Sequence, residues 1–283
     1  MRSTLPYDPR HSYAPDRSFV AKLGKWGIDL FERAMALCAT LGGAVLSVRT
    51  PGVAAAKVVR RVLLNQIFYT GFQAVGLIGT IGVLLGATIV IQTQLMVPSA
   101  DSSLIGKVLI AVVLRELSPL ITAIVVAGRS GTAIATELGN MKVSHELLAL
   151  TSLGIDPPRF IVMPRLIAAI ASVTLLMVYF AAVSLVGTAG VGLLLSNTSL
   201  AGLQSGLAAA LTPYDLVLFL AKGAGLGTIV GWLCCHYGLE VKSSPTEVPQ
   251  MASRAVVMSL LGCVAYNTLA TALFYWTVGP PLR

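Results

Sequence analysis

A long apolar run with two charges near its centre limits what this chain can fold into. From Val108 to Gly128, twenty-one residues are apolar, Gly, Ser, Thr or Pro, except for Arg115 and Glu116. A run of that length can cross the hydrocarbon core of a bilayer as a helix. Because a charge at that depth costs on the order of 3 kcal/mol, we expect the pair to have a role inside a bundle of membrane helices.

The composition of the whole chain agrees with a membrane protein. Of its 283 residues, 55% are hydrophobic and 11% are charged, against about 25% charged residues in a typical soluble domain. We therefore predict an all-α, polytopic membrane protein with five transmembrane helices. The spans are expected at about 67–97, 103–127, 160–195, 213–233 and 255–278. Short loops or polar sections are expected between them, at 97–101, 128–159, 196–212 and 237–253.

The chain before the first span divides into two parts. Residues 1–18 are polar and are expected to form a disordered tail, with no secretory signal. Within residues 19–61, apolar side chains such as Phe19, Leu23 and Trp26 recur three or four positions apart, with charges between them. This pattern predicts an amphipathic helix that lies in the membrane interface, followed by a connector, although a helix packed on a soluble partner would show the same pattern. The transmembrane domain then covers residues 62–278.

The distribution of Lys and Arg predicts the orientation of the chain. Sixteen of the twenty lie in the segments that face the cytoplasm when the N-terminus is cytoplasmic, and only Lys107 and Arg283 lie in the opposite segments. Basic residues collect on the cytoplasmic side of membrane proteins. We expect the N-terminus in the cytoplasm and, after five spans, the C-terminus on the other side.

Three charges and a proline mark a candidate site within the spans. Arg115 and Glu116 point about 100° apart on a helix, so each needs a partner on another helix. Lys222 in the fourth span is one candidate partner for Glu116. Pro119 cannot donate to the carbonyl of Arg115 and predicts a kink. Two interpretations remain open: a buried ion pair that ties helices together, or a cavity that handles a charged headgroup.

A second candidate site follows the second span. Within residues 131–150, one expected helical face carries Ile134, Leu138, Met141 and Leu148, and another carries Glu137, Asn140, Ser144 and Thr151. Such a helix could present its polar face to a partner subunit in the cytoplasm, although a solvated loop helix would show the same pattern.

The sequence has no motif for using energy or performing catalysis on its own. It lacks the phosphate-binding loop of nucleotide hydrolases and the intramembrane His and carboxylate pairs of a proton relay. The three His and four Cys show no metal-ligand spacing, and no basic stretch interleaved with aromatic residues suggests nucleic acid. We expect a non-catalytic chain without a metal or cofactor of its own, so the energy for any active transport would come from a separate subunit.

Several ordered motifs between residues 60 and 278 resemble the MlaE/YrbE permease family, the membrane subunits of ABC transporters that work with MCE proteins. The motifs are Leu114-Arg115-Glu116-Leu117-Ser118-Pro119, Ala127-Gly128-Arg129-Ser130-Gly131-Thr132-Ala133, Glu137-Leu138-Gly139-Asn140-Met141-Lys142, Ile155-Asp156-Pro157 with Pro164-Arg165, and Cys235-His236-Tyr237-Gly238 with Ser253-Arg254-Ala255-Val256-Val257.

The resemblance implies a function and a set of partners. It implies a homo- or heterodimeric permease in the bacterial inner membrane, with a periplasmic C-terminus, cytoplasmic ABC ATPase subunits that bind ATP and Mg²⁺, a periplasmic MCE protein and, in some members, a STAS-domain protein. The cargo would be a membrane lipid, most often a phospholipid. Arg115 and Glu116 match charged residues near the lipid cavity of the family.

The resemblance also identifies the segment from Gly131 to Leu150 as a coupling helix that docks on the ATPase. Its candidate contact residues are Glu137, Asn140, Met141, Lys142, Ser144, His145 and Glu146. His145 and Glu146, and Gln250 in the last cytoplasmic loop, depart from the usual family residues and suggest altered ATPase contacts.

Two other functions fit the sequence. One is a secondary transporter that uses Glu116 as its proton site, and the other is a membrane scaffold that only anchors an MCE complex.

Overall fold

The computed structural model describes residues 71, 73–97, 101–154, 157–195, 199–242 and 244–278. All of them belong to one unit of the chain, Gly43–Arg283. The expected tail at 1–18, the amphipathic helix and connector at 19–61, and the start of the first span lie outside the described residues.

The described part of the chain is helical and contains no strand, which confirms the all-α prediction. Five of its helices are long and apolar enough to cross a membrane, as predicted. They cover Ala74–Met96, Ser102–Val143, Phe160–Leu194, Pro213–Glu240 and Glu247–Thr277.

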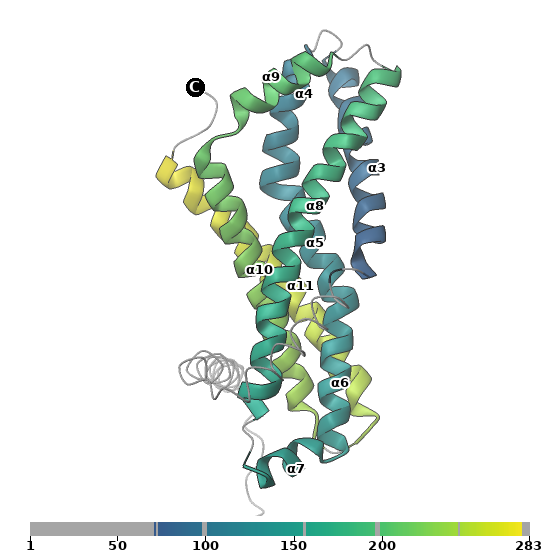
Figure 1. The fold of residues 1–283 in the computed structure, drawn as a ribbon, viewed down its shortest axis with the longest axis vertical. Coiled ribbons are helices and arrows are strands. Elements are labelled where there is room, and N and C mark those ends of the chain that lie inside the picture. Colours follow the sequence, from purple (N-terminus) through teal and green to yellow (C-terminus); the bar gives the residue numbers. More distant parts are fainter. Residues whose placement is uncertain are drawn as a thin grey trace, which may run out of the picture. The chain divides into compact units, whose positions relative to one another are not determined.

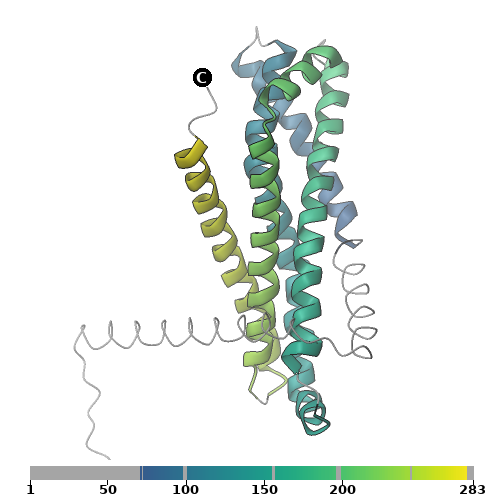
Figure 2. The same ribbon diagram turned by 60° about the vertical axis from the view of Figure 1, so that its left-hand side comes forward.

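The helices run alternately between the two ends of the bundle (Figure 1). Helix α3 (Gln73–Met96) leads to a second run made of α4 (Ser102–Leu109), η4 (Ile110–Leu117), α5 (Ser118–Val126), η5 (Ala127–Gly131) and α6 (Thr132–Val143). Helix α7 (Glu146–Ser152) follows at the far end, and η6 (Pro158–Val162) with α8 (Met163–Leu195) returns. Helix α9 (Leu200–Ala210), α10 (Pro213–Glu240) and α11 (Glu247–Val278) complete the bundle (Figure 2).

Close backbone contacts between helices depend on glycine. Helix α3 packs along α8, and a Cβ atom at Gly86 would lie 2.1 Å from the carbonyl oxygen of Ser184. Helix α9 packs across α4 in the same way, since a Cβ atom at Gly206 would lie 2.1 Å from the carbonyl oxygen of Ser103. Small residues at such positions let helices in lipid approach closely.

Three segments differ from the sequence prediction. The second helical run continues through Val143 instead of ending near residue 127, because α6 packs on α10 and α11 through buried side chains such as Ile134 and Leu138. Helices α10 and α11 likewise extend into the expected polar section, so that only residues 241–246 separate them. The expected loop at 196–212 contains α9, whose side chain of Leu203 is buried with Val90 and Ile105.

The length of the second run places its end outside the bilayer core. At 1.5 Å per residue, its 42 residues span about 63 Å. The hydrocarbon core is only about 30 Å thick. At least one end of the run therefore extends out of the hydrocarbon core.

Candidate functional site: an intramembrane charge cluster beside an apolar pocket

Arg115 in η4 forms a two-pronged ion pair with Asp215 in the first turn of α10. Its Nε lies 2.8 Å from Asp215 Oδ1, and its Nη2 donates to Oδ2 at 3.1 Å. The Arg115 side chain is 5% exposed and the Asp215 side chain is fully buried. The guanidinium also lies over the ring of Phe274 in α11, 5.9 Å from its centroid. Two parallel contacts of this kind fix the orientation of both groups as well as their separation.

The start of α10 holds the Asp215 carboxylate in place. The backbone N–H and the hydroxyl of Thr212 donate to Asp215 Oδ2 at 2.9 and 2.8 Å, and the Asp215 N–H donates to Thr212 Oγ1 at 3.3 Å. With Pro213 at the first helical position, this is a complete capping box. Asp215 thus caps the start of α10 and neutralises Arg115 at the same time.

Glu116 and Lys222 form the second ion pair, the pairing that the sequence offered as a candidate. Lys222 Nζ lies 3.3 Å from Glu116 Oε1, and it also donates to the Arg115 carbonyl oxygen and to Thr271 Oγ1. Asn267 Nδ2 donates to Glu116 Oε2 at 2.8 Å, and Thr271 Oγ1 donates to Oε1 at 2.7 Å. The Glu116 carboxylate is therefore held by α10 and α11 together.

Arg115, Asp215, Glu116 and Lys222 make up a charge cluster with no net charge. Lys222 is fully buried and Arg115 is 6% exposed, so both cations are enclosed with their partners. The only partly exposed member is Glu116, with 34% of its side chain accessible. This geometry favours the interpretation in which the charges tie η4, α10 and α11 together, since the cluster offers no exposed positive charge to a headgroup.

Sequence reasoning missed Asp215. The signal that could have found it is the Thr212-Pro213-Tyr214-Asp215 segment, which has the pattern of a helix cap with an acid at its third helical position. An acid in the first turn of a membrane span was a candidate counter-charge for Arg115.

A π-helical turn accommodates the proline at the centre of the second run. The Ser118 N–H bonds to the carbonyl oxygen of Val113, five residues back, at the end of η4. Pro119 occupies the first turn of α5, where its missing N–H matters least. Wide turns of this kind often occur at functional sites in helices. Ser118 is buried, and its hydroxyl donates to the carbonyl oxygen of Met177 in α8 at 2.9 Å.

The expected coupling segment divides into a packed part and a projecting part. In α6, Glu137 pairs with the buried Arg165 of α8 at 2.6 Å, and Lys142 Nζ donates to the Leu239 carbonyl oxygen near the end of α10. Met141 is half-buried and Asn140 is exposed.

The single helical face expected across residues 131–150 is wrong beyond Val143. His145 has a φ of 59°, in the left-handed region, and separates α6 from α7. Helix α7 consequently turns away, and none of its residues is buried. Leu148 is 68% exposed, whereas Ile134 and Leu138 are buried. Ser144, His145 and Glu146 are also exposed at this elbow.

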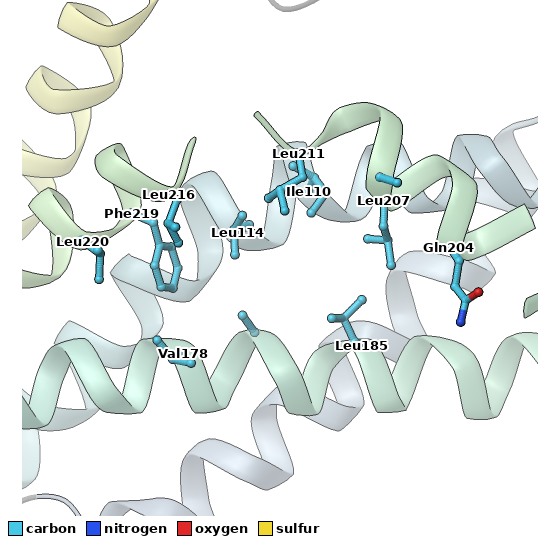
Figure 3. Close-up of a pocket in the computed structure, with 12 residues that line it drawn as sticks. Ile110, Leu114, Val178, Leu185, Gln204, Leu207, Leu211, Leu216, Phe219 and Leu220 are labelled. Atoms are coloured by element: carbon cyan, nitrogen blue, oxygen red, sulfur yellow. The ribbon is translucent and has the colours of Figure 1, made fainter. Parts of the chain in front are cut away.

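An apolar pocket of about 510 Å³ adjoins the charge cluster (Figure 3). Its wall comes from η4, α8, α9 and α10, and it includes Leu114 and Leu216, the chain neighbours of Arg115 and Asp215. The lining residues are Ile110, Leu114, Val178, Ala181, Leu185, Gln204, Leu207, Ala208, Leu211, Leu216, Phe219 and Leu220. A volume of this size lies within the range of about 300–1,000 Å³ found for ligand pockets. Over the described residues, no group of three or more His, Cys, Asp or Glu side chains could hold a metal ion.

Comparison with known proteins identifies the family. The model of the family "Permease MlaE" matches residues 63–273. The chain belongs to the MlaE permease family. The matched region contains every member of the charge cluster, the pocket lining and α7. These features therefore lie in the part of this permease that the family model covers.

Individual relatives in the family are moderately similar. The intermembrane phospholipid transport system permease protein MlaE of Haemophilus influenzae is 26% identical over 91% of this chain and 98% of its own length. A "Probable ABC transporter permease protein" of Rickettsia conorii is 28% identical over 75% of this chain and 83% of its own. The chloroplast protein TRIGALACTOSYLDIACYLGLYCEROL 1 of Arabidopsis thaliana is 34% identical over 63% of this chain, and the match spans about half, 51%, of that relative's length.

Proposed function

We propose that this chain is the membrane-spanning subunit of an ATP-driven lipid transporter, with phospholipid as its cargo. The names of the Haemophilus and Rickettsia relatives support both parts of the proposal, since one names phospholipid transport and the other an ABC transporter. The proposed location is the bacterial inner membrane, with the N-terminus in the cytoplasm and the C-terminus in the periplasm.

The observation that carries the proposal is the helical run Ser102–Val143. At one end it contributes Ile110 and Leu114 to the apolar pocket and Arg115 and Glu116 to the charge cluster. At the other end it leads directly into α7. A partner that moves α7 would therefore act on a continuous element that lines the pocket.

Helix α7 is the proposed contact with the ATPase. It is short, and none of its residues is buried. Leu148 within it is 68% exposed, and Leu153 just after its end is 74% exposed. These exposed leucines give a partner protein apolar side chains that it can cover. The proposed ATPase contact thus shifts from Gly131–Leu150 to Ser144–Gly154, because Glu137 and Lys142 hold α6 to the bundle instead.

The remaining parts of the transporter come from partners. In this proposal the chain catalyses no reaction and holds no cofactor, while ATP and Mg²⁺ bind to the ATPase subunits. A second permease copy, a periplasmic MCE protein and, in some assemblies, a STAS-domain protein complete the complex.

The test is reconstitution of the complex with its ATPase in vesicles, followed by transfer of a fluorescent phospholipid with and without ATP. Leu148→Asp is expected to remove ATPase binding and ATP-driven transfer without lowering the melting temperature of the permease, because the side chain is 68% exposed. Ala201→Asp, at an exposed position of α9 at the end of the bundle opposite to α7, is the control and should leave both intact. ATPase binding retained by Leu148→Asp would contradict the assignment of α7.

Two further outcomes would favour the other functions. Lipid uptake driven by a proton gradient, without ATPase subunits, would replace the proposal with a secondary transporter. Unchanged transfer by an assembled complex that carries Arg115→Ala or Glu116→Ala would favour a scaffold.

A further inference from the structure

The apolar pocket is polar at one end only. Eleven of its twelve lining side chains are apolar, and the exception is Gln204 of α9. In Figure 3 the labelled residues form a row in which Gln204 lies at one end and Phe219 and Leu220 lie at the other. The Gln204 amide is exposed and has no hydrogen-bond partner among the described residues.

We propose that this pocket binds one acyl chain of a membrane lipid, with the carbonyl end of the chain at Gln204 and the methyl end beside Phe219. The inference rests on the proposed function and deepens it, because it gives the lipid a site within a single permease chain. It also gives the lipid a direction.

The lining selects an acyl chain over a headgroup. No charged side chain lines the pocket. Arg115 and Asp215, the chain neighbours of two lining residues, already neutralise each other with little exposure. A charged headgroup placed there would lose its water and gain no ionic partner, which is strongly unfavourable. An alkyl chain in the pocket contacts eleven apolar side chains, so it is as well shielded from water there as it is among lipid chains.

The position of Gln204 sets the direction of the chain. Helix α9 joins the end of α8 to the start of α10, so it lies at the end of the bundle opposite to α7 (Figure 1). From there the pocket extends along α10 to Phe219 and Leu220, within the span. A lipid keeps its polar end near the membrane surface, so the chain enters from the leaflet on the α9 side. The Gln204 amide can then donate to its ester carbonyl.

The rim of the pocket faces the surroundings of the bundle. Val178, Leu211, Leu216 and Leu220 line it and are 49%, 51%, 57% and 46% exposed. These leucines and the valine lie in or next to membrane spans, where lipid is the surrounding solvent. A chain can therefore enter sideways from the bilayer without crossing a polar barrier.

The test uses the full-length permease in vesicles of phosphatidylethanolamine and phosphatidylglycerol that contain a phospholipid with a photoreactive diazirine on one acyl chain. A diazirine near the chain terminus is expected to label the α10 peptide with Leu216 and Phe219. A diazirine near the carbonyl is expected to label the α9 peptide with Gln204 and Leu207. The reverse pattern would overturn the direction, and labelling of neither peptide would overturn the site.

Variants that fill the pocket, each with a control at the neighbouring position, distinguish binding in this pocket from general contact with lipid. Ala181→Trp and Ala208→Trp place a large ring in the pocket and should reduce labelling at least fivefold. Ala182→Trp and Ala209→Trp, exposed neighbours that do not line it, should leave labelling unchanged. Equal labelling in all four variants would overturn the proposal. Co-purification with the ATPase shows that each variant is folded.

The hydrogen bond to the lipid has its own variant. Gln204→Leu removes the amide and should weaken carbonyl-end labelling about fivefold, the effect of roughly one neutral hydrogen bond. Ser205→Ala, which does not line the pocket, is its control. A second permease copy over the rim is the competing occupant. Leu211→Cys chains that oxidise to a disulfide-linked dimer, with no lipid labelling, would establish that occupant and overturn the lipid site.

Failure of this inference and failure of the proposed function give different results. Labelling needs neither ATP nor transfer, so labelled peptides in a complex without ATP-driven transfer would keep the site and reject the function. ATP-driven transfer that is unaffected by Ala181→Trp, without labelled peptides, would keep the function and reject the site.

Discussion

Asp215→Asn tests whether the charge cluster is a set of matched pairs. The substitution keeps the size of the side chain and leaves an amide oxygen that can accept the Thr212 hydrogen bonds at the start of α10. It removes the negative charge that faces Arg115. The guanidinium, 5% exposed, then has no counter-charge among the helices that surround it except Glu116, which is already paired with Lys222.

The expected loss of stability follows from this burial. Removing one partner of a buried ion pair costs about 3–5 kcal/mol, because the other charge is left without compensation. Loss of the helix cap would cost about 0.5–2 kcal/mol, and the asparagine retains most of that. The melting temperature of a chain of this size shifts by about 2–4 °C for each kcal/mol of stability. A loss of about 3 kcal/mol should therefore lower it by about 6–12 °C.

The assay is thermal unfolding of the purified permease in detergent, followed by the fraction that remains soluble and monodisperse. Asp101→Asn is the control, because Asp101 also lies at the start of a helix but is exposed and makes no capping hydrogen bond. The double variant Arg115→Met with Asp215→Asn removes both charges and should recover most of the loss. A melting temperature for Asp215→Asn equal to that of Asp101→Asn would refute the reasoning, and so would a double variant less stable than the single one.

Two further changes test the packing and the second ion pair in the same assay. Gly86→Ala should destabilise the bundle by about 1–3 kcal/mol, because its Cβ would meet the Ser184 carbonyl oxygen and push α3 away from α8. Gly76→Ala is the control and should not destabilise the bundle, since a Cβ there would have no atom within 4 Å. Equal effects of the two variants would disprove the close contact. Lys222→Met should cost about 1–3 kcal/mol, since Glu116 keeps its hydrogen bonds from α11 and some solvent but loses its cation. Lys107→Met, at an exposed position of α4, should be neutral. A neutral Lys222→Met would show that Glu116 does not depend on the pair.

The number of spans could be predicted from the sequence because it depends on local properties. A helix in lipid must satisfy its own backbone groups, so hydropathy over about twenty residues is enough to find it. The importance of Arg115 and Glu116 followed from the same argument, since a charge within such a window is conspicuous. The pairing of Glu116 with Lys222 was accessible because intramembrane cations are few.

The helix ends and the remaining partners depended on tertiary contacts. Gly128–Gly131 resembles the end of a span, yet the helix continues there because α10 and α11 cover its far side. The pairing of Arg115 with Asp215 joins residues a hundred positions apart. The sequence around Asp215 predicts a helix cap but does not show that the same carboxylate is also the counter-charge of Arg115. Helix α9 escaped prediction because its eleven residues are too few for a span.

The contacts of α6 determine how a displacement of α7 can reach the pocket. Glu137 ties α6 to Arg165 at the start of α8, and Lys142 ties it to the end of α10. These are two of the elements that line the pocket, so α6 cannot slide past them without breaking buried or charge-assisted contacts. A displacement of α7 would therefore move η4, α8 and α10 together as a group. Helices α3 and α9 instead meet their neighbours α8 and α4 through close glycine contacts. Because α9 forms the outer end of the pocket, relative movement between α9 and the group would change the pocket's width where Gln204 lies.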